Sequence, residues 1–332
     1  MNTTLHRQSR TPSTAVLAAI SAGSIALSAL TAHAGTVTVC LGGSCDFTDP
    51  VAAVNAALEG DVVEIAAGTY ALTETVALYG KSITIRGAVD ANGNPATVLD
   101  GQNARTVLSA VSMIAQPLFE NLVITKGRAN TGGGMFLSGV SPVLKNCHFR
   151  ANVANYNGGA VYLSSSNPTM IDCEITGNQS GSGPFPNSGT AGAVSVTNNV
   201  LTLIGCTVSG NSASLYGGAF LLTSSGIVNL GATRVCGNTA PTNPQVHLNG
   251  GYGTVNTDAS SCVSNTCNDC PQLTPCPADF TLDRVVNGAD LGLMLGSWGS
   301  CGTYCPHDLN FDGVVNGADL GLMLSAWGAC VN

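Results

Sequence analysis

Short apolar runs alternate with glycine and asparagine turns through the middle of the chain. Four of these runs open on two small residues, at 133–136, 158–161, 191–194 and 217–220. An asparagine stands five residues after each of Cys147, Cys173 and Cys206. Asn238 continues the asparagine series, whose steps are 26, 33 and 27 residues. This period predicts stacked coils of a parallel β-helix, and the long step contains an insertion at 179–187 that we expect to form a surface loop.

Equivalent positions in successive coils should stack on one another. Inward ladders are predicted for three sets of residues: Leu144, Met170 and Leu203; Cys147, Cys173 and Cys206; Phe149, Ile175 and Val208. The cysteine set is predicted to be a stack of buried free thiols, because free cysteine packs as a small hydrophobe. The asparagines are expected to take left-handed backbone and to hydrogen-bond along a ladder at a turn.

The first part of the chain has the pattern of an entry to this stack. Val51, Val54 and Leu58 fall on one face of a short helix predicted over 49–58, which we expect to cap the open end of the stack. Strand-like runs follow between turn signals, at 61–65, 83–85, 97–99 and 122–124.

Near the C-terminus the pattern changes to a helical one. Residues 285–295 and 314–324 are identical at eleven positions, in a repeat of 29 residues. Apolar residues at helical spacing predict a core between two antiparallel helices: Leu291, Met294, Leu295 and Trp298, with Leu320, Met323, Leu324 and Trp327. Leu293 and Leu322 lie off this stripe and are expected to be exposed.

A twelve-residue pattern of oxygen donors leads into each helix. In the second copy, positions 1, 3, 5, 7, 9 and 12 are Asp308, Asn310, Asp312, Val314, Asn316 and Asp319. In the first copy they are Asp279, Thr281, Asp283, Val285, Asn287 and Asp290. This spacing surrounds one point with the oxygens that calcium requires, position 7 using its carbonyl. Both loops are therefore predicted to bind Ca²⁺, the second more strongly because it has Gly313 where the first has Arg284.

The distribution of charge supports the metal loops. The formal net charge is −8, so the chain lacks the basic field that attracts nucleic acid. All six acids after Cys276 fall at loop positions 1, 5 or 12, whereas a solvated surface would scatter them. The alternative is a pair of Asx-rich turns that hold no metal.

The N-terminus has the pattern of a secretory signal. Arg7 and Arg10 precede an apolar stretch at 15–30, and Ala32-His33-Ala34 is a small-x-small cleavage site. We expect cleavage before Gly35 and a secreted or surface-attached protein. A membrane anchor is the alternative, and no later segment has the length to span a membrane.

The chain has 13 cysteines, and export would favour disulfides among them. Equal separations of 25 residues predict two pairs, Cys276–Cys301 and Cys305–Cys330. The sequence leaves four others without an assigned partner: Cys236, Cys262, Cys267 and Cys270. A zinc site is an alternative for a cluster of cysteines near this end, Cys262, Cys267, Cys270 and Cys276.

One outward patch carries acid–base groups. Alignment of the coils on their asparagines places His148 beside Glu174, and Arg150 beside Thr176. Asp172 and Glu174 are expected to alternate along one strand, about 6.5 Å apart, a spacing compatible with a catalytic carboxylate pair. The alternative is a solvated surface ion pair of little energetic value.

Residues 60–70, together with the later glycine, cysteine and asparagine coils, resemble the pectin lyase-like superfamily of right-handed parallel β-helices over about residues 36–262. The resemblance implies a fold more than an activity, because that superfamily contains lyases, hydrolases, adhesins and non-catalytic surface proteins. Residues 175–257 contain one charged residue, Arg234, which is thin for acid–base chemistry. We therefore favour a non-catalytic, adhesive or carbohydrate-contacting β-helix; a polysaccharide lyase or glycoside hydrolase is the alternative.

The duplicated loops and helices resemble dockerins, in particular the glycine- and cysteine-rich type at the C-termini of exported proteins. The resemblance implies calcium ligation and a cohesin-like or other surface anchoring protein as the partner. Loop positions 10 and 11, where many dockerins carry a polar pair for cohesin contact, are Gly-Ala in both copies, so anchoring or sorting at the cell surface is an equally open role. The expected organisation is a signal peptide (1–34), a β-helix (35–262), a Cys/Pro-rich linker (263–275) and an EF-hand-like, all-α module (276–332).

Overall fold

The structure is a computed structural model that describes residues 34–111, 115–183, 188–251, 253–258, 260–270, 278–281, 285–300, 307–310 and 313–329. The expected signal peptide therefore lies outside the described residues, apart from Ala34. Among the described residues, no helix is both long enough and apolar enough to span a membrane.

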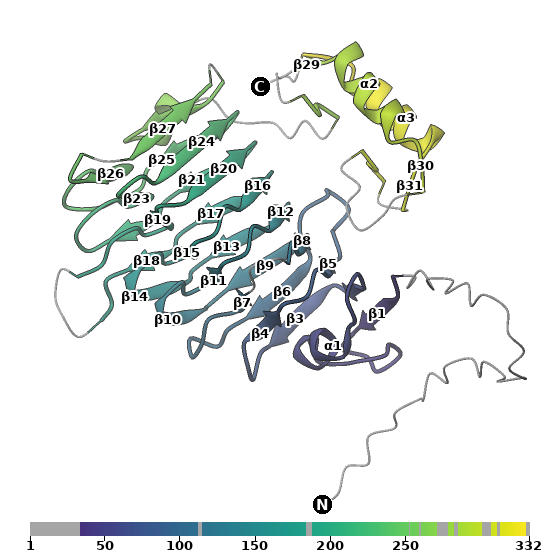
Figure 1. The fold of residues 1–332 in the computed structure, drawn as a ribbon, viewed down its shortest axis with the longest axis horizontal. Helices are drawn as coiled ribbons and strands as arrows, with labels where there is room; N and C mark the ends of the chain where they lie inside the picture. Colours follow the sequence, from purple (N-terminus) through teal and green to yellow (C-terminus); the bar gives the residue numbers. More distant parts are fainter. Residues whose placement is uncertain are drawn as a thin grey trace, which may run out of the picture. The chain divides into compact units, whose positions relative to one another are not determined.

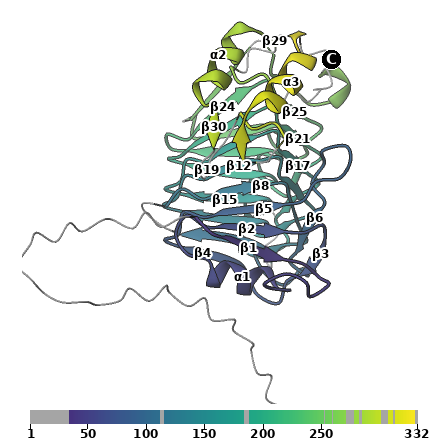
Figure 2. The same cartoon turned by 90° about the vertical axis from the view of Figure 1, so that its right-hand side faces the viewer.

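Residues 36–264 wind into a parallel β-helix of about eight coils, whose strands stack into four sheets (Figure 1). The first sheet contains, in spatial order, β1 (Thr36–Val39), β2 (Val62–Ile65), β5 (Thr84–Gly87), β8 (Leu118–Glu120), β12 (Val143–Lys145), β16 (Thr169–Ile171), β20 (Val200–Ile204), β24 (Ile227–Gly231) and β27 (Thr254–Thr257). Figure 2 shows β1, β2, β5, β8 and β12 of this sheet stacked in that order.

The other three sheets complete each coil. The second contains β3 (Gly68–Ala71), β6 (Thr97–Asp100), β9 (Leu122–Thr125), β13 (His148–Arg150), β17 (Glu174–Thr176), β21 (Thr207–Ser209), β25 (Arg234–Cys236) and β28 (Cys262–Ser264). The third contains β4 (Val76–Tyr79), β7 (Leu108–Val111), β11 (Met135–Ser138), β15 (Val161–Ser164), β19 (Val194–Thr197), β23 (Phe220–Thr223) and β26 (Val246–Asn249). The fourth contains β10 (Arg128–Thr131), β14 (Val153–Asn157), β18 (Gln179–Ser180) and β22 (Ser212–Ala213).

The predicted inward ladders are confirmed. Leu144 pairs with Met170, and Met170 pairs with Leu203, so the three side chains stack in the core. The ladder of Phe149, Ile175 and Val208 is formed in the same way on the second sheet. Because side chains alternate along a strand, each coil gives one apolar residue per pair to the shared core.

The cysteine ladder is a stack of buried free thiols, as predicted. The Cys147 N–H donates to Cys173 Sγ and the Cys173 N–H donates to Cys206 Sγ, each at 3.4 Å. Burial raises the pKa of Cys173 and of Cys206 well above the ordinary value. Since the thiolate is the reactive species, these side chains act as core residues.

The asparagine ladder is also confirmed, with one correction. Nδ2 of Asn152, Asn178 and Asn211 each donates to Oδ1 of the asparagine in the next coil at 2.9 Å, ending at Asn238. The expected left-handed backbone belongs to the residue before each asparagine, as at Ala151 with φ 53°. The turn is made by that preceding residue, and the asparagine amide is left to hydrogen-bond inside.

A short helix, α1 (Pro50–Ala56), begins with Asp49 as its N-cap, whose carboxylate accepts the Val51 N–H at 3.0 Å. Val51 and Val54 pack into the solenoid core, as predicted. The prediction for Leu58 was wrong, because the helix ends at Ala56 and Leu58 is exposed.

Three disulfides are present among the described residues: Cys40–Cys45, Cys236–Cys267 and Cys262–Cys270. The last two fix a 3₁₀ turn, Cys267–Asp269, against the final coil. The zinc alternative was wrong, because three of its four cysteines are in disulfides. The predicted pairs of Cys276, Cys301, Cys305 and Cys330 lie outside the described residues.

The C-terminal repeats form two helices, α2 (Gly288–Gly296) and α3 (Gly317–Ser325), and two short antiparallel ladders. The strand before α2, β29 (Val285–Val286), pairs with the strand after α3, β32 (Gly328–Ala329). The strand after α2, β30 (Gly299–Ser300), pairs with the strand before α3, β31 (Val314–Val315). Each repeat thus completes a ladder with the other.

The core of these repeats differs from the predicted one. Val286, Met294, Val315 and Met323 are fully buried, and Leu291 and Leu320 pack against them: the expected stripe is only partly formed. The exposed members of the stripe are Leu295, Trp298, Leu324 and Trp327. Short nine-residue helices place only one apolar row inward, while the small valine ladders fill the space that the tryptophans were expected to fill.

Candidate functional site

Both C-terminal helices start with the same polar arrangement. Asn287 and Asn316 are N-caps, and each side-chain oxygen accepts the N–H of the following alanine at position 289 or 318, at 2.7 Å. The position-12 carboxylates of Asp290 and Asp319 return to the N-cap N–H at 2.9 Å, so each helix has a full capping box. Two predicted ligands of each loop therefore also fix the start of its helix.

The first loop brings three of its predicted ligands together. The Thr281 N–H donates to Asp290 Oδ1 at 2.7 Å. The Thr281 hydroxyl lies 2.9 Å from the same oxygen and 3.4 Å from Asp279 Oδ1. Threonine at position 3 thus links the carboxylates at positions 1 and 12. Burial raises the pKa of Asp290, but N–H donation from Thr281 and Asn287 outweighs it and holds that pKa below its usual value.

The second loop holds its carboxylates in the same way. Asp319 Oδ1 accepts the N–H of Leu309 at 2.8 Å and of Asn310 at 3.2 Å. The Gly313 N–H donates to Asp308 Oδ2 at 2.8 Å, and Gly313 has a φ of 89°, a left-handed conformation that favours glycine. Burial raises the pKa of Asp319, but these backbone donors outweigh it and the pKa is lowered.

The metal prediction itself is not tested by this geometry. Asp283 and Asp312, the position-5 carboxylates, lie outside the described residues. Within the described residues, no three His, Cys, Asp or Glu side chains converge closely enough to hold a metal. The donors that are described nevertheless fit a hard cation in chemical type, because they are buried carboxylates, side-chain amides and backbone carbonyls. The sequence from 278 to 329 has a single cationic side chain of the Lys/Arg type, Arg284.

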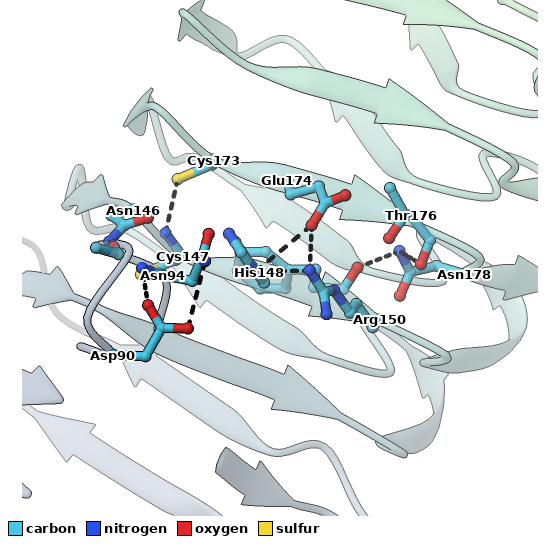
Figure 3. Close-up of polar contacts among 12 residues, drawn as sticks. Asp90, Asn94, Asn146, Cys147, His148, Arg150, Cys173, Glu174, Thr176 and Asn178 are labelled. Atoms are coloured by element: carbon cyan, nitrogen blue, oxygen red, sulfur yellow. Dashed lines mark hydrogen bonds and ion pairs between the residues drawn. The ribbon is translucent and has the colours of Figure 1, made fainter. Parts of the chain in front are cut away.

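The outward patch on the second sheet forms a compact ion pair (Figure 3). Residues 148 and 174 face each other across β13 and β17, as predicted. Arg150 donates one hydrogen bond to Glu174 Oε2 and lies 2.8 Å, through Nη2, from His148 Nδ1. Guanidinium can only donate, so Nδ1 of His148 is the acceptor and carries no proton.

The charge state of His148 follows from its surroundings. Burial lowers the pKa of His148, the positive Arg150 lowers it further, and Glu174 opposes both. His148 Nδ1 lies 3.5 Å from Glu174 Oε2, too far for a good hydrogen bond. The Glu174 charge is compensated by Arg150, so the patch fits the surface ion pair better than a catalytic pair.

The expected carboxylate pair is not formed. Asp172 does not alternate with Glu174 along a strand, because β16 ends at Ile171 and β17 begins at Glu174. Asp172 is the corner residue between these strands, with a φ of 50°. The left-handed corner turns the chain between two sheets, and the period-two argument fails there.

A hollow of about 260 Å³ lies on another part of the solenoid, and its lining includes Glu64 and Arg86. The sequence analysis did not single out this place. Coil spacing is irregular there: Arg86 is 34 residues from its partner Glu120, whereas the later coils repeat at about 26. Only the alternation of Glu64 between Val63 and Ile65 indicated an outward acid.

No protein-family model matches the chain, and no curated protein matches it. A pectin methylesterase from Aspergillus niger is similar in structure, with a TM-score of 0.38 and 12% identity over 74% of this chain and 93% of that one. An alginate lyase from Paenibacillus sp. str. FPU-7 has a TM-score of 0.29 and 14% identity over 67% of this chain and 99% of that one. We base no activity on either likeness, and the β-helix assignment rests on the strand register. Neither structure is a dockerin, so that resemblance stays a hypothesis.

Proposed function

We propose that this chain is a secreted β-helix protein that is anchored at a cell surface by its duplicated C-terminal repeats, and that the solenoid contacts carbohydrate without catalysing a reaction. One observation carries the anchoring role. Three apolar residues of α2 are as exposed as their counterparts on α3: Leu293 and Leu322 at 44% and 45%, Leu295 and Leu324 at 52% each, Trp298 and Trp327 at 48% each.

Matched exposure of large apolar side chains supports a protein-binding face. Single exposed apolar residues are ordinary on a protein surface, but here six of them repeat in pairs on two helices that contact each other. Tryptophan is strongly enriched among the residues that dominate binding energy at interfaces. A surface protein with an apolar docking face is therefore the proposed partner, cohesin-like or of another anchoring type.

Calcium has a structural role in this proposal. The residues that would hold it are Asp279, Thr281, Asp283, Val285, Asn287 and Asp290 in the first loop, and Asp308, Asn310, Asp312, Val314, Asn316 and Asp319 in the second. When bound, the ion would neutralise the clustered carboxylates. Asp290 and Asp319 already fix the helix starts, so metal binding and the orientation of α2 and α3 are expected to be coupled.

The ion pair of Arg150 with Glu174 supports a non-catalytic solenoid, as does the unprotonated Nδ1 of His148. A polysaccharide lyase or glycoside hydrolase is the competing function. Asp172 at a turn and Glu174 in an ion pair do not provide the two free carboxylates that a hydrolase requires.

Anchoring is tested by attachment of the labelled full-length chain to intact cells of the organism that encodes it, in calcium and in chelator. We expect attachment in calcium only, and loss of at least about tenfold in affinity for Trp298→Ser with Trp327→Ser. The matched control is Tyr79→Ser with Leu248→Ser, two exposed apolar residues of the solenoid. Equal attachment by both double variants, or attachment that survives chelator, would contradict the proposal.

A further inference from the structure

The hollow on the outer side of the first sheet combines aliphatic and charged surface. It has a volume of about 260 Å³ and lies at the ends of β1, β2 and β5. Apolar parts of its lining come from Val39, Ile65, Ala66 and Ala88, and charged parts from Glu64 and Arg86. Ligand sites of drug size start at about 300 Å³, so this hollow has the size for one small ring.

Strand register creates the charged side of the hollow. Glu64 pairs with Arg86, and Arg86 pairs with Glu120, so three outward side chains of alternating charge occupy adjacent coils. Arg86 Nε donates to Glu120 Oε2 at 2.8 Å, and Arg86 Nη1 lies 3.7 Å from Glu64 Oε1. The side chains are exposed by 8% at Glu120, 27% at Arg86 and 49% at Glu64.

These exposures assign different roles to the two acids. Glu120 is buried and holds the guanidinium of Arg86 in place. Glu64 is half exposed and meets Arg86 only at ion-pair distance. An acceptor, Glu64, and the outer N–H groups of Arg86 are therefore presented together at a solvent-accessible place, next to aliphatic side chains.

The rim of the hollow is rigid before any ligand arrives. Cys45 lines it and is joined to Cys40 by a disulfide. Asp46 Oδ2 accepts both the N–H and the hydroxyl of Thr38, each at 2.9 Å. Two backbone hydrogen bonds, from Cys40 to Phe47 and from Phe47 to Thr38, close the loop onto β1. A preformed site of this kind loses little conformational entropy on binding.

We infer that this hollow binds one neutral pyranose unit of a polysaccharide. A sugar ring has apolar C–H faces and a rim of hydroxyls, which matches aliphatic side chains flanked by a carboxylate acceptor and guanidinium donors. Three acids, Asp46, Glu64 and Glu120, stand near a single Arg86, so the local charge is negative and disfavours uronate or sulfated units. This inference rests on the proposed carbohydrate contact and gives it a location and a sugar class.

The test is calorimetric titration of the full-length protein with cellohexaose, xylohexaose and mannohexaose, and with hexagalacturonate as the charged comparison. We expect at least one neutral oligosaccharide to bind more tightly than hexagalacturonate. Ala66→Phe, which fills the hollow from an exposed position, should weaken that binding at least about tenfold, while Ala67→Phe, the adjacent exposed alanine outside the lining, should not.

A second pair of variants tests the charge. Glu64→Gln should weaken binding about fivefold, since a charged acceptor is replaced by a neutral one, and the exposed Glu74→Gln should bind as the wild type does. Binding that ignores both Ala66→Phe and Glu64→Gln would overturn the site and leave carbohydrate contact standing. Tighter binding of hexagalacturonate would overturn the sugar class, and no binding of any neutral oligosaccharide would overturn the inference together with the carbohydrate contact. Surface anchoring is measured separately by the tryptophan variants.

Discussion

Among single residues, the buried amide of Asn178 has the largest number of structural duties. Its Oδ1 accepts two hydrogen bonds from Asn152, and its Nδ2 donates to Asn211 and to the Phe149 carbonyl. Asn178→Ala would leave several buried polar groups without a partner, each at a cost of about 1–3 kcal/mol. We therefore expect a loss of about 3 kcal/mol in the free energy of unfolding, measured by urea denaturation.

An exposed amide pair provides the control for this change. Asn256 Nδ2 donates to Asn229 Oδ1 at 2.8 Å on the outside of the first sheet. Water can replace that bond, so Asn256→Ala should change the free energy of unfolding by no more than about 0.5 kcal/mol. Similar losses for the two variants would show that burial of the ladder is not what makes it stabilising.

Asp100 makes stability depend on pH. Burial raises the pKa of Asp100, but hydrogen bonds from Lys126 Nζ at 2.7 Å and from the Gln102 N–H at 2.8 Å outweigh it and lower the pKa. A carboxyl whose folded pKa is lowered stabilises the fold above its unfolded value, near 3.9, and loses that contribution as the pH falls through the folded pKa.

Asp100→Asn should therefore cost about 1–2 kcal/mol at pH 7. The difference from the wild type should shrink below about pH 4, where the wild-type carboxyl also becomes neutral. Thermal unfolding of both proteins from pH 2.5 to pH 7 measures this. A difference that stays constant over the whole range would assign the effect to packing rather than charge.

At the scale of elements, the C-terminal helices offer a selective optical probe. The chain has two tryptophans, Trp298 and Trp327, and each follows one of these helices. Two nine-residue helices are marginal alone, so closure of the loops by calcium should raise the midpoint of their unfolding. Tryptophan fluorescence during heating, in calcium and in chelator, reports this part of the full-length protein without a contribution from the solenoid.

Single-loop variants separate the two predicted sites. Asp308→Ala should lower calcium affinity by about tenfold, and by more than Asp279→Ala does, because the second loop keeps the left-handed Gly313 and the amide of Asn310. Calcium titrations followed by the same fluorescence signal give both affinities. An unfolding midpoint that is identical in calcium and in chelator would show that these helices are held without metal.

At the scale of the whole molecule, the solenoid behaves as a row of coils, each stabilised by its neighbours. The disulfides Cys236–Cys267 and Cys262–Cys270 hold the last coils. Removal of the first by Cys236→Ala with Cys267→Ala should cost about 2–4 kcal/mol. Hydrogen exchange should show faster opening in β25 and β28 while β6 and β9 keep their protection. Uniform loss of protection across the solenoid would contradict this end-to-end independence.

Much of the solenoid could be predicted because its later coils repeat regularly. Leu144, Met170 and Leu203 were placed correctly by period alone, and so was the pairing of His148 with Glu174. Asp172 was misplaced because a left-handed corner interrupts the strand. Glu64, Arg86 and Glu120 come from the early coils, where uneven spacing hides which residues become neighbours.

The exposed tryptophans were missed for a different physical reason. Helical spacing identifies a stripe, but it does not state how wide a row the partner surface can cover. In this molecule Met294 and Met323 meet at a narrow contact with Val286 and Val315, so Trp298 and Trp327 are left outside. An apolar stripe on a short helix is therefore as compatible with a binding face as with a core.

The exchange of short strands between the C-terminal repeats makes the two loops interdependent. Val285–Val286 contains position 7 of the first loop, yet its ladder partner follows the second helix, and Val314–Val315 depends on the exit of the first helix in return. Ordering one loop therefore prepares the partner strand of the other. We expect positive cooperativity in calcium binding, with a Hill coefficient above one, and neither repeat should function as an independent unit after its twin is deleted.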